Sequence, residues 1–273
     1  MTSHETESLE QIYQTHADVR PARLSVDSAA EVYGDYVRFV AAHRQDGKLL
    51  DVGCGVGWST YLFASQGFDA TGIDLNPDAF EPPAHESLTL EAGNGMSIPF
   101  PDATFDVVSA YQVLEHVNVP ETMLEEMLRV AKPGGVVCIV GPNLLGINAY
   151  VRAVTRHIWT VRPRYKMFIR TADMPRHPRG NTFPELLCSF PVVLAWICSK
   201  YVAKEAKFTM REPDMRPPFS ADNDATYFCN PLDLEKYFKA KGCQRLRDAA
   251  LGRPRWTRML AGGTWFAAKK PMT

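Results

Sequence analysis

The chain has 273 residues, of which 45% are hydrophobic, and its formal net charge is −1. This length fits one large domain or a domain with an insertion, and the near-neutral charge gives no general reason to expect nucleic-acid binding. Six scattered cysteines without a CxxC pair, a polar and acidic N-terminus, and no apolar run of about 18–20 residues predict a cytoplasmic protein without a signal peptide or membrane span.

Residues 1–45 carry apolar side chains at helix-like spacing and are predicted to form one or two lid helices. Further along, short apolar runs alternate with helical patterns, which indicates a parallel sheet with crossover helices. The predicted strands are 48–52, 70–74, 88–91, 105–110 and 136–141, and the helices between them are 58–66 and 121–131. The Lys-Pro-Gly-Gly sequence at 132–135 is expected to stop the second helix before a strand.

The most informative segment is 49–57, in which an apolar strand runs into a turn with Gly53, Gly55 and Gly57. Glycine tolerates positive φ and lets a ligand approach the backbone closely. A turn that opens onto a helix N-terminus is expected to point N–H groups and the positive dipole end outward, toward a carboxylate or phosphate. A dinucleotide fingerprint would place its third glycine at position 58, where this chain has Trp58, so a nucleoside ligand other than NAD is favoured.

This loop resembles the first motif of class I S-adenosylmethionine-dependent methyltransferases. Asp51 is expected at the carboxyl end of the first strand, where open α/β sheets bind ligands, or simply as a cap of the turn. Asp74 ends the second strand, where a carboxylate can accept from both ribose hydroxyls. Asn94 stands where the family pattern has an acid that meets the adenine amino group. Its oxygen can still accept, and the amide of Gly95 or Met96 can donate to the ring, unless this is a plain turn.

After the fourth strand, Leu-Glu-His at 114–116 resembles the same segment of the ubiquinone/menaquinone-type methyltransferases. His116 is a candidate general base because its unperturbed pKa, near 6.5, allows it to take a hydroxyl proton at neutral pH. The alternative is that Glu115 and His116 only pack and start a helix. Those relatives associate a further upstream acid with a divalent ion, but Gln112 occupies that position, so no metal is expected.

Residues 129–136 resemble the family's turn before the fifth strand, and the resemblance covers 49–142 closely. It implies a Rossmann-like α/β fold: a seven-stranded, mostly parallel sheet with helices on both faces and a mainly helical cap inserted after strand 5. The expected organisation is lid helices at 1–45, a SAM-binding core at 46–143, the cap at 144–228, and a closing helix with the last two strands at 229–273. Asn230 and Pro231 start that helix, Gly242 ends it, and the strands are expected near 245–250 and 264–269.

The cap is where the acceptor is expected to bind. Eight basic residues between 152 and 179, against the single acid Asp173, suggest an anionic acceptor or a solvated basic surface. The apolar run 186–198, with lysines following up to 207, predicts a buried cap helix or a dimer contact, with membrane-surface contact through 186–207 as the alternative. Tyr227, His157 and His177 are alternative bases.

These features predict a SAM-dependent methyltransferase, monomeric or homodimeric, that methylates a small-molecule acceptor. O-methylation of an anionic or glycosyl-type acceptor by direct displacement is preferred. An RNA or protein methyltransferase, an enzyme for lipid-linked substrates, and a catalytically idle binding module are the alternatives. The predicted cofactor-binding residues are Asp51, Gly53, Cys54, Gly55, Gly57, Asp74, Leu75, Asn94, Gly95, Met96, Tyr111 and Gln112. The predicted acceptor-side residues are His116, Asn143, Arg152 and Tyr227, with His116 catalytic.

Overall fold

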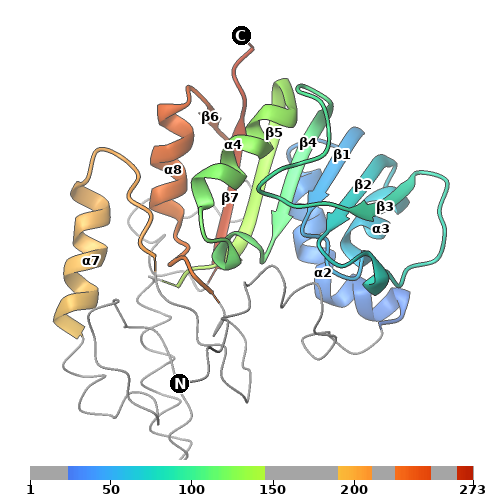
Figure 1. Cartoon of the computed structure of the whole chain (residues 1–273), viewed down its shortest axis with the longest axis horizontal. Helices are drawn as coiled ribbons and strands as arrows, with labels where there is room; N and C mark the ends of the chain where they lie inside the picture. Colours follow the sequence, from blue (N-terminus) through green and yellow to red (C-terminus); the bar gives the residue numbers. More distant parts are fainter. Residues whose placement is uncertain (1–23, 145–189, 211–224, 247–262, 273) are drawn as a thin grey trace, which may run out of the picture. The chain divides into compact units, whose positions relative to one another are not determined.

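The computed structural model describes residues 24–144, 190–210, 225–246 and 263–272. Seven strands form one sheet in the order β3-β2-β1-β4-β5-β7-β6 (Figure 1). Their bounds are Gly47–Val52 (β1), Phe68–Asp74 (β2), Leu88–Ala92 (β3), Phe105–Tyr111 (β4), Ala131–Pro142 (β5), Gln244–Arg245 (β6) and Gly263–Lys269 (β7). The β1–β2, β1–β4 and β2–β3 pairs are parallel, whereas β6 and β7 are antiparallel. The predicted seven-stranded, mostly parallel sheet is therefore confirmed.

Strand β1 lies at the point where the strand order reverses. Its last residue, Val52, is in register with Ile73 of β2 on one side and with Ala110 of β4 on the other. The chain leaves β1 toward β2 and β3 and then returns to β4, so the carboxyl ends of β1, β2 and β4 reach the same edge of the sheet. In open α/β sheets this switch point is where ligands bind.

Two helices accompany the first strands. Helix α2, Val26–Ala41, begins at Ser25, whose hydroxyl accepts a hydrogen bond from the Ser28 N–H at 3.2 Å. Helix α3, Trp58–Ser65, follows the glycine loop directly and packs on β2, and α2 packs on α3. The predicted helix 58–66 is thus confirmed to within one residue. Of the predicted lid helices one is described, and residues 1–23 lie outside the described residues.

Helix α4, Pro120–Val130, gives way at once to β5, so the strand begins earlier than predicted. The Lys-Pro-Gly-Gly motif lies within the bounds of β5 instead of before them. It still makes a tight turn there, because Gly134 has a φ of 72° and a β-carbon on Gly135 would lie 2.8 Å from the carbonyl oxygen of Lys132.

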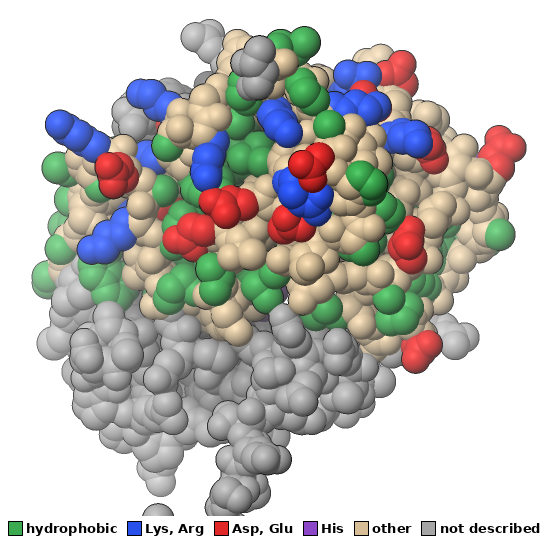
Figure 2. Space-filling model, turned by 45° about the horizontal axis from the view of Figure 1, so that its top comes forward, with side chains coloured by type: hydrophobic (Ala, Val, Ile, Leu, Met, Phe, Trp, Pro, Cys, Tyr) green, Lys and Arg blue, Asp and Glu red, His purple; other side chains and the backbone are tan. Residues whose placement is uncertain are grey.

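Charged side chains are interspersed on the face of the molecule shown in Figure 2, with acidic groups beside basic ones. The bonds of Arg129 in α4 show one such pairing of charges: its guanidinium donates to the Glu126 carboxylate at 2.7 Å and to the Asp102 carboxylate at 2.8 Å, wherever on the surface these groups lie. It also donates to the carbonyl oxygens of Ile98 and Phe100. This cluster fastens the loop between β3 and β4 to α4.

The described chain divides into two compact units. The first unit comprises the residues up to Tyr111 together with 122–137, and the second comprises 112–121 and 138–271. The second unit contains the short helix η3 (Leu114–His116) and the helices α7 (Phe190–Val202) and α8 (Pro231–Ala240). The domain boundaries expected from the sequence stay a prediction.

The closing elements follow the expected capping signals. Asn230 caps α8 by accepting from the Asp233 N–H at 3.0 Å, Pro231 stands in the first turn, and Gly242 follows the helix with a φ of 75°. Strand β6 has only two residues, Gln244 and Arg245, of which Arg245 falls in the region predicted as 245–250; residues 247–250 lie outside the described residues. None of the described helices is long and apolar enough to cross a membrane.

Candidate active site

The glycine loop has the conformation that its sequence predicts. Gly53, Gly55 and Gly57 have φ angles of 69°, 56° and 92°, all in the left-handed region. Its N–H groups, however, do not point outward as expected. Those of Gly53 and Cys54 donate to the Ile73 carbonyl at 2.8 and 3.0 Å. The N–H of Gly55 donates to Asp74 at 2.9 Å, and that of Gly57 donates to Cys54. For these four amides the expectation was wrong, because three of them donate to residues of β2 and that of Gly57 closes the loop onto Cys54.

The loop still leaves room for a ligand at one glycine. Gly55 is exposed, and no atom lies within 4 Å of the place where its β-carbon would be. Gly57 differs, because a β-carbon there would lie 2.7 Å from Leu90. Gly55 therefore presents bare backbone to open space, which is the surface that a nucleoside-type donor can approach, whereas Gly57 is required for packing.

Asp51 is completely buried, and its carboxylate is bound by the protein itself. One oxygen accepts from the Tyr36 hydroxyl at 2.8 Å, and the other accepts from Ser59 at 2.6 Å and Thr60 at 3.0 Å. Burial raises the pKa of Asp51 to about 6, outweighing the opposing effect of these hydrogen bonds. In the structure Asp51 therefore joins β1, α2 and the start of α3.

Asp74 ends β2 with its carboxylate beside the glycine loop. It accepts from the N–H of Gly55 at 2.9 Å and of Asn76 at 3.1 Å, and the Leu75 N–H also bonds to it. Burial raises the pKa of the Asp74 carboxyl despite these contacts. The side chain is only half-buried, and a carboxylate has more acceptor sites than these amides fill, so Asp74 keeps capacity for ribose hydroxyls.

The loop after β3 comes back toward the end of β1, because a β-carbon on Gly95 would lie 2.9 Å from a methyl group of Val52. Within this loop the Asn94 side-chain oxygen accepts from the Met96 N–H at 2.8 Å. The expectation that the Met96 amide donates to an adenine ring is thus not met in this conformation, because the same group closes a turn onto Asn94.

Two tyrosines of α2 contact Tyr111 of β4, an arrangement that was not predicted from the sequence. Tyr36 lies 4.8 Å from Tyr111 of β4 between ring centroids, and Tyr33 lies 5.7 Å from the same ring. Burial, followed by the nearby Asp51 charge, raises the pKa of Tyr33 to about 12, so its hydroxyl stays a proton donor. The spacing of Tyr33 and Tyr36 indicated a helix, but only the fold shows that both meet Tyr111.

Cys54 does not act as a nucleophile in this arrangement. Its side chain is buried, and burial raises the pKa of the thiol well above its usual range. A β-carbon on Gly72 would lie 2.8 Å from its sulfur, so Cys54 fills space between the loop and β2.

In the second unit, His116 stands beside a buried acid. Its Nε2 atom lies 3.7 Å from a carboxylate oxygen of Glu115, and the two side chains are 20% and 0% exposed. Gln112, just upstream, has a φ of 56° although it is not a glycine, and its N–H donates to Val140 at 2.7 Å. A non-glycine residue in the left-handed region stores strain of the kind that gathers at functional sites.

The segment just before α8 holds the backbone around His116. The N–H groups of Thr226 and Tyr227 donate to the Glu115 carbonyl at 2.7 and 3.1 Å, and the Thr226 hydroxyl donates to Val117 at 2.7 Å. Tyr227 itself is completely buried, and its hydroxyl donates to Asp233 at 3.3 Å. Burial raises the pKa of that hydroxyl well above its usual range, which disfavours the ionised form that a base would need.

Two predicted acceptor-side residues remain, Asn143 and Arg152. Asn143 is buried just after β5. Arg152, His157 and His177 lie outside the described residues, as does the basic segment 152–179.

A parallel sheet with this strand order, a glycine loop after β1 and an acid after β2 define a Rossmann-like nucleoside-binding protein. A model of the methyltransferase domain family matches residues 50–139. The chain is 34% identical over 160 residues to a ubiquinone biosynthesis O-methyltransferase of Methylococcus capsulatus, a match that covers 53% of this chain and 67% of that protein. The chain therefore belongs to the S-adenosylmethionine-dependent methyltransferases, and S-adenosylmethionine is the cofactor that family and fold imply.

Other relatives match over a smaller share. Norajmaline N-methyltransferase of Rauvolfia serpentina is 32% identical over 126 residues, which are 41% of this chain and 43% of that enzyme. This chain thus spans less than half the length of that relative. Among solved structures, a methyltransferase of Mesorhizobium loti matches with a TM-score of 0.53 at 14% identity, over 90% of this chain and 100% of its own. A protein of Listeria monocytogenes reaches 0.55 at 13% identity, over 89% and 99%. These two likenesses concern the fold.

Proposed function

We propose that this chain transfers a methyl group from S-adenosylmethionine to a hydroxyl oxygen of a small anionic acceptor, with His116 as general base. The observation that carries the proposal is the imidazole of His116 beside the buried carboxylate of Glu115, in a chain of this family. The relative that this chain matches over the largest share of both sequences among those described above is named an O-methyltransferase, which favours oxygen over nitrogen or carbon.

The first unit would hold the donor. Asp74 would accept from the ribose hydroxyls, the bare backbone of Gly55 would let the nucleoside approach, and the loop at 94–96 would face the adenine. Asp51 would act indirectly, by fixing α2 and the start of α3 around the loop. When bound, the donor supplies an electrophilic methyl group on a positively charged sulfur.

His116 would remove the acceptor's proton. The hydroxyl oxygen would form the new bond to the methyl carbon, the electrons of the carbon–sulfur bond would leave with sulfur, and the hydroxyl proton would pass to the His116 imidazole. The neighbouring Glu115 carboxylate stabilises the imidazolium that results. Positioned general bases contribute about 10²–10⁴-fold to rates.

An anionic acceptor is supported by the sequence alone. The segment 152–179 carries eight basic residues and one acid, and arginine binds carboxylate and phosphate in a bidentate manner.

The test has two stages. Titration calorimetry of the full chain with S-adenosylmethionine and S-adenosylhomocysteine should show binding of both, and absence of both would refute the enzyme assignment. Transfer of a tritiated methyl group is then measured with acceptors sorted by class: catechol and phenol carboxylates, their neutral counterparts, amines, RNA and a protein extract. We expect transfer to hydroxylated carboxylates. Transfer only to amines, RNA or protein would reject the proposed acceptor while leaving the donor assignment intact.

A further inference from the structure

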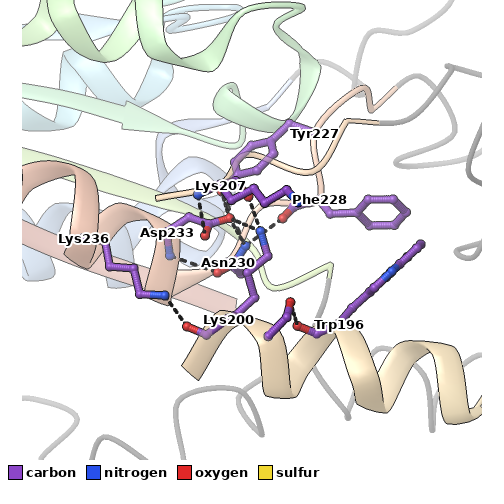
Figure 3. A network of polar contacts seen from close by, with 9 residues as sticks. Trp196, Lys200, Lys207, Tyr227, Phe228, Asn230, Asp233 and Lys236 are labelled. Atoms are coloured by element: carbon purple, nitrogen blue, oxygen red, sulfur yellow. Dashed lines mark hydrogen bonds and ion pairs between the residues drawn. The ribbon is translucent and has the colours of Figure 1, made fainter. Parts of the chain in front are cut away.

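The second unit contains a buried carboxylate, that of Asp233, which accepts hydrogen bonds from four groups. Asp233, in the first turn of α8, is 0% exposed. One of its oxygens accepts from the Lys200 ammonium at 2.7 Å, the Asn230 amide at 2.8 Å and the Tyr227 hydroxyl at 3.3 Å (Figure 3). The other accepts from the Lys207 N–H at 3.4 Å. Asp233 is thus the centre of a network that joins residues distant in the sequence.

The lysine in this network belongs to α7. The side chain of Lys200 is only 3% exposed, and its ammonium also donates to the Lys207 carbonyl. The carbonyl of Lys200 in turn accepts from the Lys236 ammonium of α8 (Figure 3). Removing a charge from water costs several kcal/mol unless its partners are complete, so this network holds α7 to α8 in one defined arrangement.

The same network continues toward His116. Tyr227 bonds to Asp233 through its hydroxyl, and its backbone N–H, with that of Thr226, donates to the Glu115 carbonyl. A second backbone contact runs from Phe228 to the chain after α7, where the Phe228 N–H donates to the Thr209 carbonyl at 2.9 Å. The segment 226–228 is therefore fixed on one side by Asp233 and its partners and on the other by the backbone next to His116.

We infer that the Lys200–Asp233 ion pair is a positioning pair for His116, acting through Tyr227 and Thr226 on the backbone of Glu115. The inference rests on the proposed function only in giving His116 the role of base. It gives α7 a role in the reaction, because the position of that helix would determine the position of the His116 imidazole.

Hydrogen exchange and NMR on the full chain test this without an acceptor. In Asp233→Asn the N–H groups of Thr226 and Tyr227 should exchange at least about tenfold faster, relative to those of β1, because their segment loses its anchor. The His116 titration midpoint should fall as Glu115 moves away and stabilises the imidazolium less. Tyr227→Phe removes one hydroxyl and keeps the ion pair, so it should fold and show the same changes to a smaller extent.

Phe238→Leu serves as the matched control, because Phe238 is also buried on α8 but contacts Phe266 of β7, with 5.1 Å between ring centroids. It should destabilise the protein while leaving the ratio of the two exchange rates and the His116 titration unchanged. If Asp233→Asn and Tyr227→Phe behave like this control, the ion pair is only structural and the inference fails. Calorimetry with S-adenosylhomocysteine, run on the same samples, reports on the donor site separately, so a failure of the proposed function is distinguishable.

Discussion

The two units of this protein each contain a buried aspartate at the centre of a hydrogen-bond network, and the two networks differ in kind. Asp51 in the first unit is bound by three hydroxyl groups. Asp233 in the second unit is bound by an ammonium, an amide and one hydroxyl. Burial raises the pKa of Asp51 to about 6, although its three hydroxyl partners act in the opposite direction.

The networks also differ in how far apart their members lie in the chain. Asp51 is bound by Ser59 and Thr60, which follow it by eight and nine residues, and by Tyr36, which precedes it by 15. Asp233 is bound by Asn230 and Tyr227, which precede it by three and six residues, and by Lys200, which precedes it by 33. The longest contact in sequence is thus the ion pair of the second network. The following experiments test this contrast, beginning with the largest expected effect.

Replacing His116 by alanine should lower turnover by about 10²–10⁴-fold, because a positioned base is lost, while the affinity for S-adenosylhomocysteine stays unchanged. Turnover is measured with the acceptor found in the transfer assay, and affinity by calorimetry. His85→Ala is the control, since His85 lies in the first unit and accepts from the Ser87 N–H there. A His116→Ala protein with full turnover would show that His116 is not the base and that the second unit does not supply it through this residue.

Stability should depend on pH through Asp51. Its folded pKa of about 6 lies above the unfolded value of 3.8, so the folded state binds the proton more tightly. The stabilisation is complete below the unfolded pKa and is lost as the pH rises through about 6. The total is about 3 kcal/mol in the free energy of unfolding, of which about 1 kcal/mol falls between pH 5 and 7. Urea unfolding should show that the free energy of unfolding of the wild type falls between pH 5 and 7 relative to that of Asp51→Asn. Parallel pH profiles of the two proteins would contradict this prediction.

Asp74→Asn should weaken S-adenosylhomocysteine binding by about 10–100-fold, which corresponds to hydrogen bonds of about 1.5–3 kcal/mol with a charged group. The exposed Asp78 lies four residues further on, so Asp78→Asn provides a matched loss of one carboxylate. Calorimetry on both variants measures the effect. Equal affinities would mean that the donor does not use the acid after β2.

Gly55→Ala and Gly67→Ala form a pair that separates backbone strain from ligand contact. Both glycines have positive φ, 56° and 97°, and neither has an atom within 4 Å of the place of a β-carbon. Each substitution should cost about 1 kcal/mol of stability. Only Gly55→Ala should also weaken donor binding, and a similar loss in Gly67→Ala would show that the loop is not the contact surface.

The sequence predicted the sheet and its edge because periodicity and glycine spacing are local signals. It placed Asp74 at the end of the second strand and a left-handed turn at Gly55, as the structure has them. It missed the direction of the loop amides, since that depends on β2 lying alongside. Likewise, Asp51 was expected at the binding edge, and its partner Tyr36 comes from a helix that precedes the sheet. The Lys200–Asp233 pair left no local signal, because a lysine in an apolar helix and an aspartate after an N-cap are each ordinary until the fold brings them together.

The turn at Gly135 has a consequence for how such a protein can change over time. A side chain there would meet the backbone carbonyls of Lys132 and Asp106, at 2.8 and 3.1 Å from its first carbon, and the backbone has little freedom to give way. This demand is independent of what is methylated. A side chain at Gly135 should therefore be costly whatever the acceptor is. The match to the family model at 50–139 includes this turn, and such a match leaves the substrate open.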